Sequence, residues 1–211
     1  MGWAVASALF APGTGLAQTV DVGLKLAFYV PVGALVDTGS SANPKTHFQQ
    51  RLAAAPLLGA NVVVWTSSRL GFAGSIGYTP STVAQSDTFG THDYHSSVLL
   101  TSARVLYAFT PMLFTPRPGH REVPWSFYVG VGVGVASRSG TVWAYSSGLT
   151  SPALELNVGV RTPLGSRVVM RLDVEDYISR AQFDKGLATE TAARTHNDLI
   201  ISASFAFRAR R

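Results

Sequence analysis

Apolar and polar residues alternate along the stretch 167–178, and this alternation predicts a β-strand with one apolar and one charged face. Its even positions are apolar as far as Val174, whereas its odd positions carry Arg171, Asp173 and Glu175. Seven further stretches repeat the pattern and are also expected to be strands. The eight predicted strands are 20–30, 52–65, 70–78, 97–110, 125–137, 154–161, 167–178 and 199–207.

The connections between these strands alternate in length. Short turns are expected at 66–69 and 162–166. Long polar loops are expected between the first two strands, around 39–44, and at 79–95, 138–151 and 179–197. Short turns at one end and long loops at the other are typical of outer-membrane barrels, and an even strand count places both termini on the same side. We therefore predict an all-β fold, an eight-stranded antiparallel up-and-down transmembrane β-barrel. The proline-rich connection 111–124 is longer than such a barrel usually has at that end.

Alternation alone does not say which face is inside, because a soluble lipocalin-like barrel would bury its apolar face. The composition of the other face, opposite the apolar residues, favours the membrane barrel. It is rich in Gly, Ala and Ser, with glycine at positions 130, 132 and 134, and small residues fit a narrow interior beside Tyr128 and long Arg and Lys chains. Only 14% of residues are charged against 46% hydrophobic, and no apolar run is long enough for a membrane-spanning helix.

Aromatic residues on the apolar face gather at the strand ends nearest the termini. Such a ring is typical of the interface between membrane and water. The predicted girdle consists of Tyr107, Phe109, Trp125, Phe127, Phe205 and Phe207.

Three basic and three acidic residues fall on the predicted interior face near the middle of the barrel. Buried charges are tolerated when they are paired, so salt bridges that plug the interior are the simplest interpretation. A gated ion path, or a carboxylate pair for acid–base chemistry, is the alternative. The turn 162–166 is expected to bring Glu155 within one or two rungs of both Arg171 and Asp173. The predicted interior network consists of Lys25, Arg104, Glu155, Arg171, Asp173 and Glu175.

Taken together, the stretch 20–207 resembles the small eight-stranded outer-membrane barrels of bacteria, the OmpA-type transmembrane domain and its OmpX-type relatives. In that family the last strand usually ends the chain at an aromatic residue. Here Phe205 and Phe207 match the alternation, but the basic tail 208–211 follows, either as a frayed terminus or in contact with anionic headgroups. We expect no peptidoglycan-binding domain after the barrel, so the resemblance does not imply an anchoring role.

The remaining chemistry is sparse. The chain has no cysteine. Its net charge of +5 is assigned largely to Lys and Arg residues that are expected to face the interior, including Arg161 and Arg167, so it is not taken as a sign of nucleic-acid binding. The stretch 92–97 (HDYHSS) brings histidine close to serine and allows an envelope hydrolase such as a lipid A deacylase, or a loop metal site at His92 and His95. We expect no catalytic residue, metal ion or cofactor.

Residues 1–17 resemble a signal peptide without its basic start, or else form a buried first helix, and 18–211 form one barrel domain. The expected function is that of a non-enzymatic, monomeric barrel in the outer membrane of a Gram-negative-type bacterium, serving envelope integrity or surface interaction. The alternative is a narrow pore or an OmpW-like carrier of small hydrophobic molecules. Expected partners are outer-membrane lipid, lipopolysaccharide and the barrel-assembly machinery.

Overall fold

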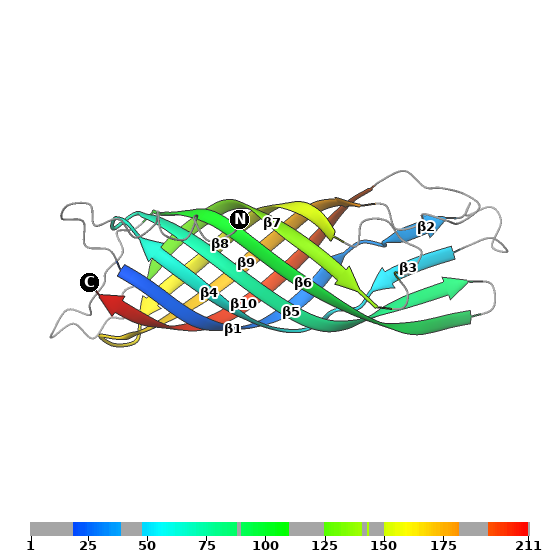
Figure 1. Ribbon diagram of the computed structural model, residues 1–211, viewed down its shortest axis with the longest axis horizontal. Helices are drawn as coiled ribbons and strands as arrows, with labels where there is room; N and C mark the ends of the chain where they lie inside the picture. Colours follow the sequence, from blue (N-terminus) through cyan, green and yellow to red (C-terminus); the bar gives the residue numbers. More distant parts are fainter. Residues whose placement is uncertain are drawn as a thin grey trace, which may run out of the picture.

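The computed structural model describes residues 19–38, 48–87, 90–109, 125–140, 143, 150–181 and 194–210. Within them it has ten β-strands, eight of which form a closed ring (Figure 1). No helix in these segments is long and apolar enough to cross a membrane. The strands are β1 (Thr19–Val32), β2 (Val36–Thr38), β3 (Phe48–Leu52), β4 (Ala55–Trp65), β5 (Leu70–Asp87), β6 (Gly90–Ala108), β7 (Ser126–Ser139), β8 (Thr150–Pro163), β9 (Val168–Ala181) and β10 (Arg194–Arg210).

The ring closes because β1 pairs with both β10 and β4. Every other ring strand pairs antiparallel with its neighbour in sequence, in the order β4, β5, β6, β7, β8, β9 and β10. The predicted eight-stranded up-and-down barrel is therefore confirmed. The short strands β2 and β3 extend the wall at one end, where β3 pairs with β5.

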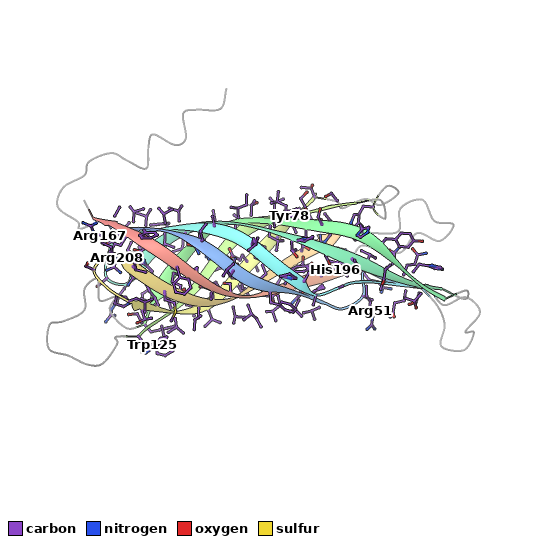
Figure 2. All side chains as sticks on the ribbon, turned by 90° about the horizontal axis from the view of Figure 1, so that it is seen from below. Arg51, Tyr78, Trp125, Arg167, His196 and Arg208 are labelled. Atoms are coloured by element: carbon purple, nitrogen blue, oxygen red, sulfur yellow. The ribbon has the colours of Figure 1, made fainter. Side chains whose placement is uncertain are left out.

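Side chains alternate across the wall as the sequence pattern predicts. On β1, Leu24 is 75% exposed and its neighbour Lys25 only 2%. The outward valines, leucines and phenylalanines of all eight ring strands form a continuous apolar belt (Figure 2). Such a surface is stable against hydrocarbon rather than water, because a soluble protein rarely exposes so large an apolar patch.

The six predicted girdle residues all point outward near the end where β1 begins and β10 stops. Phe207 pairs with Val22 near the start of β1, and the backbone of Phe109 bonds to that of Phe127. Figure 2 shows Trp125 at this end, together with Arg167 and Arg208. Arg167 is exposed in the turn before β9, so its expected interior position is wrong.

The expected loop 79–95 is wrong as well. Strands β5 and β6 continue in regular register as far as the pair Asp87 and Gly90, forming a hairpin that projects past the other ring strands, beside β2 and β3. The alternation fades here because this part of the wall stands outside the apolar belt, where both faces carry polar residues. The loops 138–151 and 179–197 are likewise shorter than expected, since β7, β8, β9 and β10 all extend into them.

The expected single strand 52–65 is two strands, and the wall is interrupted beside β5. Pairing of β4 with β5 ends at Leu58 and Tyr78, and β3 resumes pairing at Leu52 and Val83. Pro56 and Pro80 lie in the interruption, and proline has no N–H to donate to a ladder. The hydroxyls of Thr79 and Ser81 instead donate to the carbonyls of Pro56 and Ala53, at 2.9 and 2.8 Å.

Two predictions lie outside the described residues. They are the signal peptide at 1–17 and the proline-rich connection 111–124.

Candidate functional site in the barrel interior

The barrel interior has two apolar clusters with a charged layer between them. Along β6, Leu106 belongs to the cluster near the termini, Arg104 to the charged layer, and Leu100 to the second cluster, which lies toward the hairpin. The same order holds on β4, where Val63 and Leu57 belong to the two clusters and Asn61 lies between them. We call these the terminal cluster and the external cluster.

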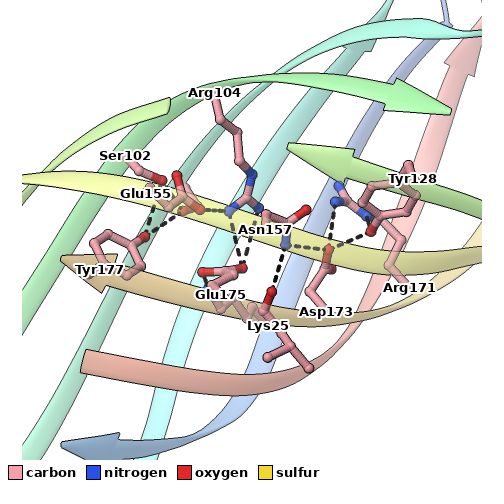
Figure 3. A network of polar contacts seen from close by, with 12 residues as sticks. Lys25, Ser102, Arg104, Tyr128, Glu155, Asn157, Arg171, Asp173, Glu175 and Tyr177 are labelled. Carbon is pink, nitrogen blue, oxygen red and sulfur yellow. Dashed lines mark hydrogen bonds and ion pairs between the residues drawn. The ribbon is translucent and has the colours of Figure 1, made fainter. Parts of the chain in front are cut away.

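In the charged layer, Glu175 connects two cations. The Nζ of Lys25 lies 2.6 Å from Glu175 Oε2, and Arg104 Nη1 lies 3.3 Å from Glu175 Oε1 (Figure 3). Arg104 also pairs with Glu155. All four side chains are almost completely buried, and they come from four different strands, so the ion pairs cross the lumen and join opposite walls.

Asp173 forms the second centre of this layer. Its Oδ1 accepts hydrogen bonds from the Tyr128 hydroxyl, from Asn157 Nδ2 at 3.1 Å and from Arg171 Nη2 at 3.2 Å. The Arg171 guanidinium also donates to the Tyr128 hydroxyl at 2.9 Å and lies 5.0 Å from the centre of that ring. Gly159 makes room for this arrangement, since a Cβ there would lie 2.5 Å from the Tyr128 ring.

The structure therefore places all six predicted network residues in the interior, three cations with three carboxylates. It separates Glu155 from Arg171, contrary to expectation. In the ladder, Glu155 faces Tyr177 and Arg171 faces Arg161. Residues that face each other across a hairpin are equally far from its turn, and Glu155 is farther from the turn than Arg171.

A smaller ionic group, which sequence reasoning missed, lies at the end near the termini. Asp21 accepts from Arg161 at 3.0 Å and from Arg208 at 3.3 Å, and all three side chains are buried. The Arg161 guanidinium also lies 5.9 Å from the centre of the Trp65 ring. Arg208 is thus part of the barrel wall and not of a frayed tail. Its inward position in the alternation of β10 could have indicated this.

A third group lies at the level of the external cluster, which includes Tyr29. Asp198 accepts hydrogen bonds from Tyr29 and from Arg138, and both side chains are buried. Arg138, which the expected loop 138–151 would place outside the barrel wall, is therefore part of that wall. His196 is buried nearby, on the external side of the apolar belt. Burial lowers the pKa of the His196 imidazole below its ordinary value, and the positive charge of Arg138 lowers it further.

The histidine and serine residues of 92–97 do not form a catalytic pair in the described part of the chain. The Ser96 hydroxyl accepts from the indole of Trp143 at 2.8 Å, and the Ser97 hydroxyl lies 2.7 Å from that of Ser139. The described residues also contain no group of three metal-ligating side chains.

Solved structures with the same fold are known. The outer membrane protein OprG from Pseudomonas aeruginosa matches 94% of this chain and 99% of its own, with a TM-score of 0.65 and 12% identity. AlkL, solved in lipid bilayers, matches 95% of both chains, with a TM-score of 0.57 and 14% identity. The chain has the fold of the small outer-membrane β-barrels. Neisserial surface protein A matches 90% of this chain and 96% of its own, with a TM-score of 0.51 and 13% identity.

Neither a protein-family model nor the sequence of a curated protein matches this chain. At the identities of the solved structures, the likeness establishes the fold. The function has to be argued from the interior and the surface of the barrel itself.

Proposed function

We propose that this chain is a non-enzymatic protein of the bacterial outer membrane, a closed barrel that serves envelope integrity or surface interaction through its external end. The single observation that carries the proposal is the order of layers inside the barrel. The ion-paired layer lies between two apolar clusters, each built from buried side chains. Outer-membrane lipid and lipopolysaccharide surround the barrel, which is inserted by the barrel-assembly machinery and acts as a monomer.

An ion that crossed this interior would have to pass both apolar clusters and the charged layer. In the terminal cluster, Trp65 packs edge-on against Tyr128, with ring centres 6.3 Å apart. In the external cluster, Tyr177 donates to Ser102 at 3.1 Å, which fixes its ring across the lumen. Removing an ion from water without new partners costs far more than thermal energy, so these layers oppose conduction.

Planar-bilayer recording of the purified, refolded protein tests this proposal. The wild-type barrel is expected to give no steady channels over a wide voltage range. Steady, reproducible conductance would contradict a closed barrel interior. Fractionation of cells that express the chain tests the location, since recovery in the soluble fraction would contradict a place in the membrane.

A hydrolase would act on the envelope lipid itself. Mass spectrometry of lipid A from cells with and without the protein tests this directly. We expect identical lipid A in both, since the Ser96 and Ser97 hydroxyls bond to Trp143 and Ser139 rather than to a histidine. Loss of an acyl chain only in the presence of the protein would contradict the non-enzymatic proposal.

The wall interruption at Pro56 and Pro80 favours a second candidate, an OmpW-like carrier of small hydrophobic molecules. A surface pocket of about 240 Å³ lies there, lined by 53–55, 80–82 and His95. The ladder pairing of β4 with β5 is absent here, and the Thr79 and Ser81 hydroxyls bridge the wall instead. Uptake of a small apolar fluorophore into liposomes tests the candidate. A Pro56→Val, Pro80→Val variant restores two N–H donors and is expected to slow uptake, whereas equal rates in both would exclude this route.

A further inference from the structure

A buried histidine lies at the external end of β10. His196 (Figure 2) is 4% exposed and points into the barrel. Its outward neighbours on the strand, Thr195 and Asn197, are polar, and the first apolar outward residue after them is Leu199. His196 therefore lies at the external edge of the apolar belt. The imidazole titrates in the physiological range, so the pH of the external medium governs its charge at this level.

Polar side chains from four strands surround this imidazole within the described residues. They are Tyr29 on β1, Arg138 on β7, Ser179 on β9, and Arg194 and Asp198 on β10. Asp198 is the one carboxylate among them, and its two oxygens already accept from Tyr29 and Arg138. A proton on His196 would place a third cation beside this carboxylate. Burial and the charge of Arg138 both oppose that proton.

The strand that carries His196 is paired on one side only at this level. From Arg194 to His196, β10 pairs with β9 alone, and its pairing with β1 begins at Asn197. The next β1 partner is Pro31, opposite Asp198, and proline has no N–H to donate. Strand ends with so few ladder bonds open at low free energy. An inward side chain stays on the lumen side while its strand is paired, so opening of this end is what would expose His196.

We propose that His196 makes the external pairing of β9 with β10 dependent on pH. Above about pH 6.5 the imidazole is neutral, and 194–196 stays paired with 179–181. As the pH falls, a proton binds more readily to the open form, in which water solvates the imidazolium and Arg138 is farther away. Acid therefore shifts the equilibrium toward the open form. The inference adds a regulation to the external end and rests on the proposed role of that end in surface interaction.

The bonds of Asp198 limit how far the opening extends. Its carboxylate is bonded to Tyr29 on the neighbouring strand β1 and to Arg138 across the lumen on β7. The next inward residue on β10, Ile200, is fully buried in the external cluster. Opening should therefore stop before residue 198 and leave the barrel closed. The acid form would expose backbone N–H and C=O groups of two short strand ends at the surface, where an extended partner can pair with them.

Hydrogen exchange of the folded full chain in micelles, followed by NMR at about pH 7.5 and about pH 5, tests the inference. Protection factors remove the intrinsic pH dependence of amide exchange. We expect the protected amides among 194–196 and 179–181 to lose protection several-fold at the acid pH, whereas 199–206 keeps its protection. The His196→Gln variant stays neutral and should keep the same protection at both pH values.

The wild type supplies a second measurement that needs no variant. The imidazole resonance of His196 should titrate with the same midpoint as the loss of protection. Matched controls are His92→Gln and His95→Gln on β6, which are exposed and should leave the acid response as it is in the wild type.

Loss of protection at acid pH in His196→Gln would overturn the inference. Protonation of His196 in the wild type without loss of protection, or with a different midpoint, would overturn it as well. Conductance and fractionation at neutral pH test the proposed function separately, so the two can fail independently.

Discussion

Substitution of Arg171 is the simplest test of the charged interior, because Arg171 is the cation that contacts Asp173. We expect Arg171→Ala to lower the free energy of unfolding by about 3 kcal/mol, as removal of one side of a buried pair usually does. The loss should shrink at acid pH, because a protonated Asp173 no longer needs the guanidinium. Urea unfolding in detergent or lipid at neutral and acid pH, followed by tryptophan fluorescence, measures both effects.

The matched control is Arg167→Ala, in the exposed turn before β9. An exposed arginine contributes less than about 1 kcal/mol, so this variant should unfold like the wild type at either pH. If the two variants lost the same stability without any pH dependence, the interior position of Arg171 would be refuted.

His196 gives a second test at the level of single residues. Its folded-state pKa lies below the ordinary value of 6.5, so the unfolded chain binds a proton more readily. The stabilising contribution of the neutral imidazole is present above about pH 6.5 and is lost as pH falls toward the lowered folded value. His196→Gln should therefore unfold with less dependence on pH across that window. An unchanged pH profile in unfolding experiments would show that His196 is not buried beside Arg138.

The sequence predicts side-chain direction well, but not side-chain partners. Alternation correctly placed Lys25, Arg104 and Glu175 inside, because a strand has only two faces. The pairing of each cation with a particular carboxylate depends on the tilt and register of the strands. The alternation of apolar and polar residues gives no information about either. The positions of Arg138 and Arg208 in the barrel wall were not predicted, for a related reason. Both lie beyond the apolar residues of their strands, where the wall still continues.

At the scale of elements, the hairpin of β5 and β6 differs from the rest of the wall. From Gly90 to Ser96, β6 pairs with β5 alone, whereas from Ser97 onward it also pairs with β7. We expect every second amide of 90–96 to exchange quickly with solvent, because those N–H groups point to an open edge. The amides of 99–108 should be protected throughout. Hydrogen exchange followed by NMR in micelles measures this, and uniform protection of 90–96 would mean that the edge is covered.

The interruption between β3 and β4 shows what a strand pattern cannot convey. Apolar residues run through 52–65 without a gap, so the stretch resembles one strand. Two prolines on facing strands, Pro56 and Pro80, remove ladder donors at the same place. Their alignment becomes visible only once the pairing of β4 with β5 is known.

At the scale of the whole molecule, the barrel combines a lipid-facing belt with a charged interior closed by apolar clusters. Strand count, closure and the direction of each face followed from sequence, because short turns and alternation leave few other arrangements for eight amphipathic strands. The order of apolar and charged layers inside the barrel could not be predicted from the sequence. It depends on where the inward residues of different strands meet, as Leu57, Leu100 and Tyr177 do in the external cluster.

The assignment of faces is tested most directly by spin labels placed one at a time along β10 from Leu199 to Phe207, in a chain that contains no native cysteine. In lipid vesicles, labels at the outward positions Ile201 and Phe205 should collide strongly with dissolved oxygen, which concentrates in hydrocarbon. Labels at the buried positions Ser202 and Ser204 should collide weakly with oxygen and with a water-soluble nickel complex. A period of two in oxygen accessibility is the expected result. Strong nickel collisions at Ser202 and Ser204 would mean a water-filled lumen and would contradict the closed interior.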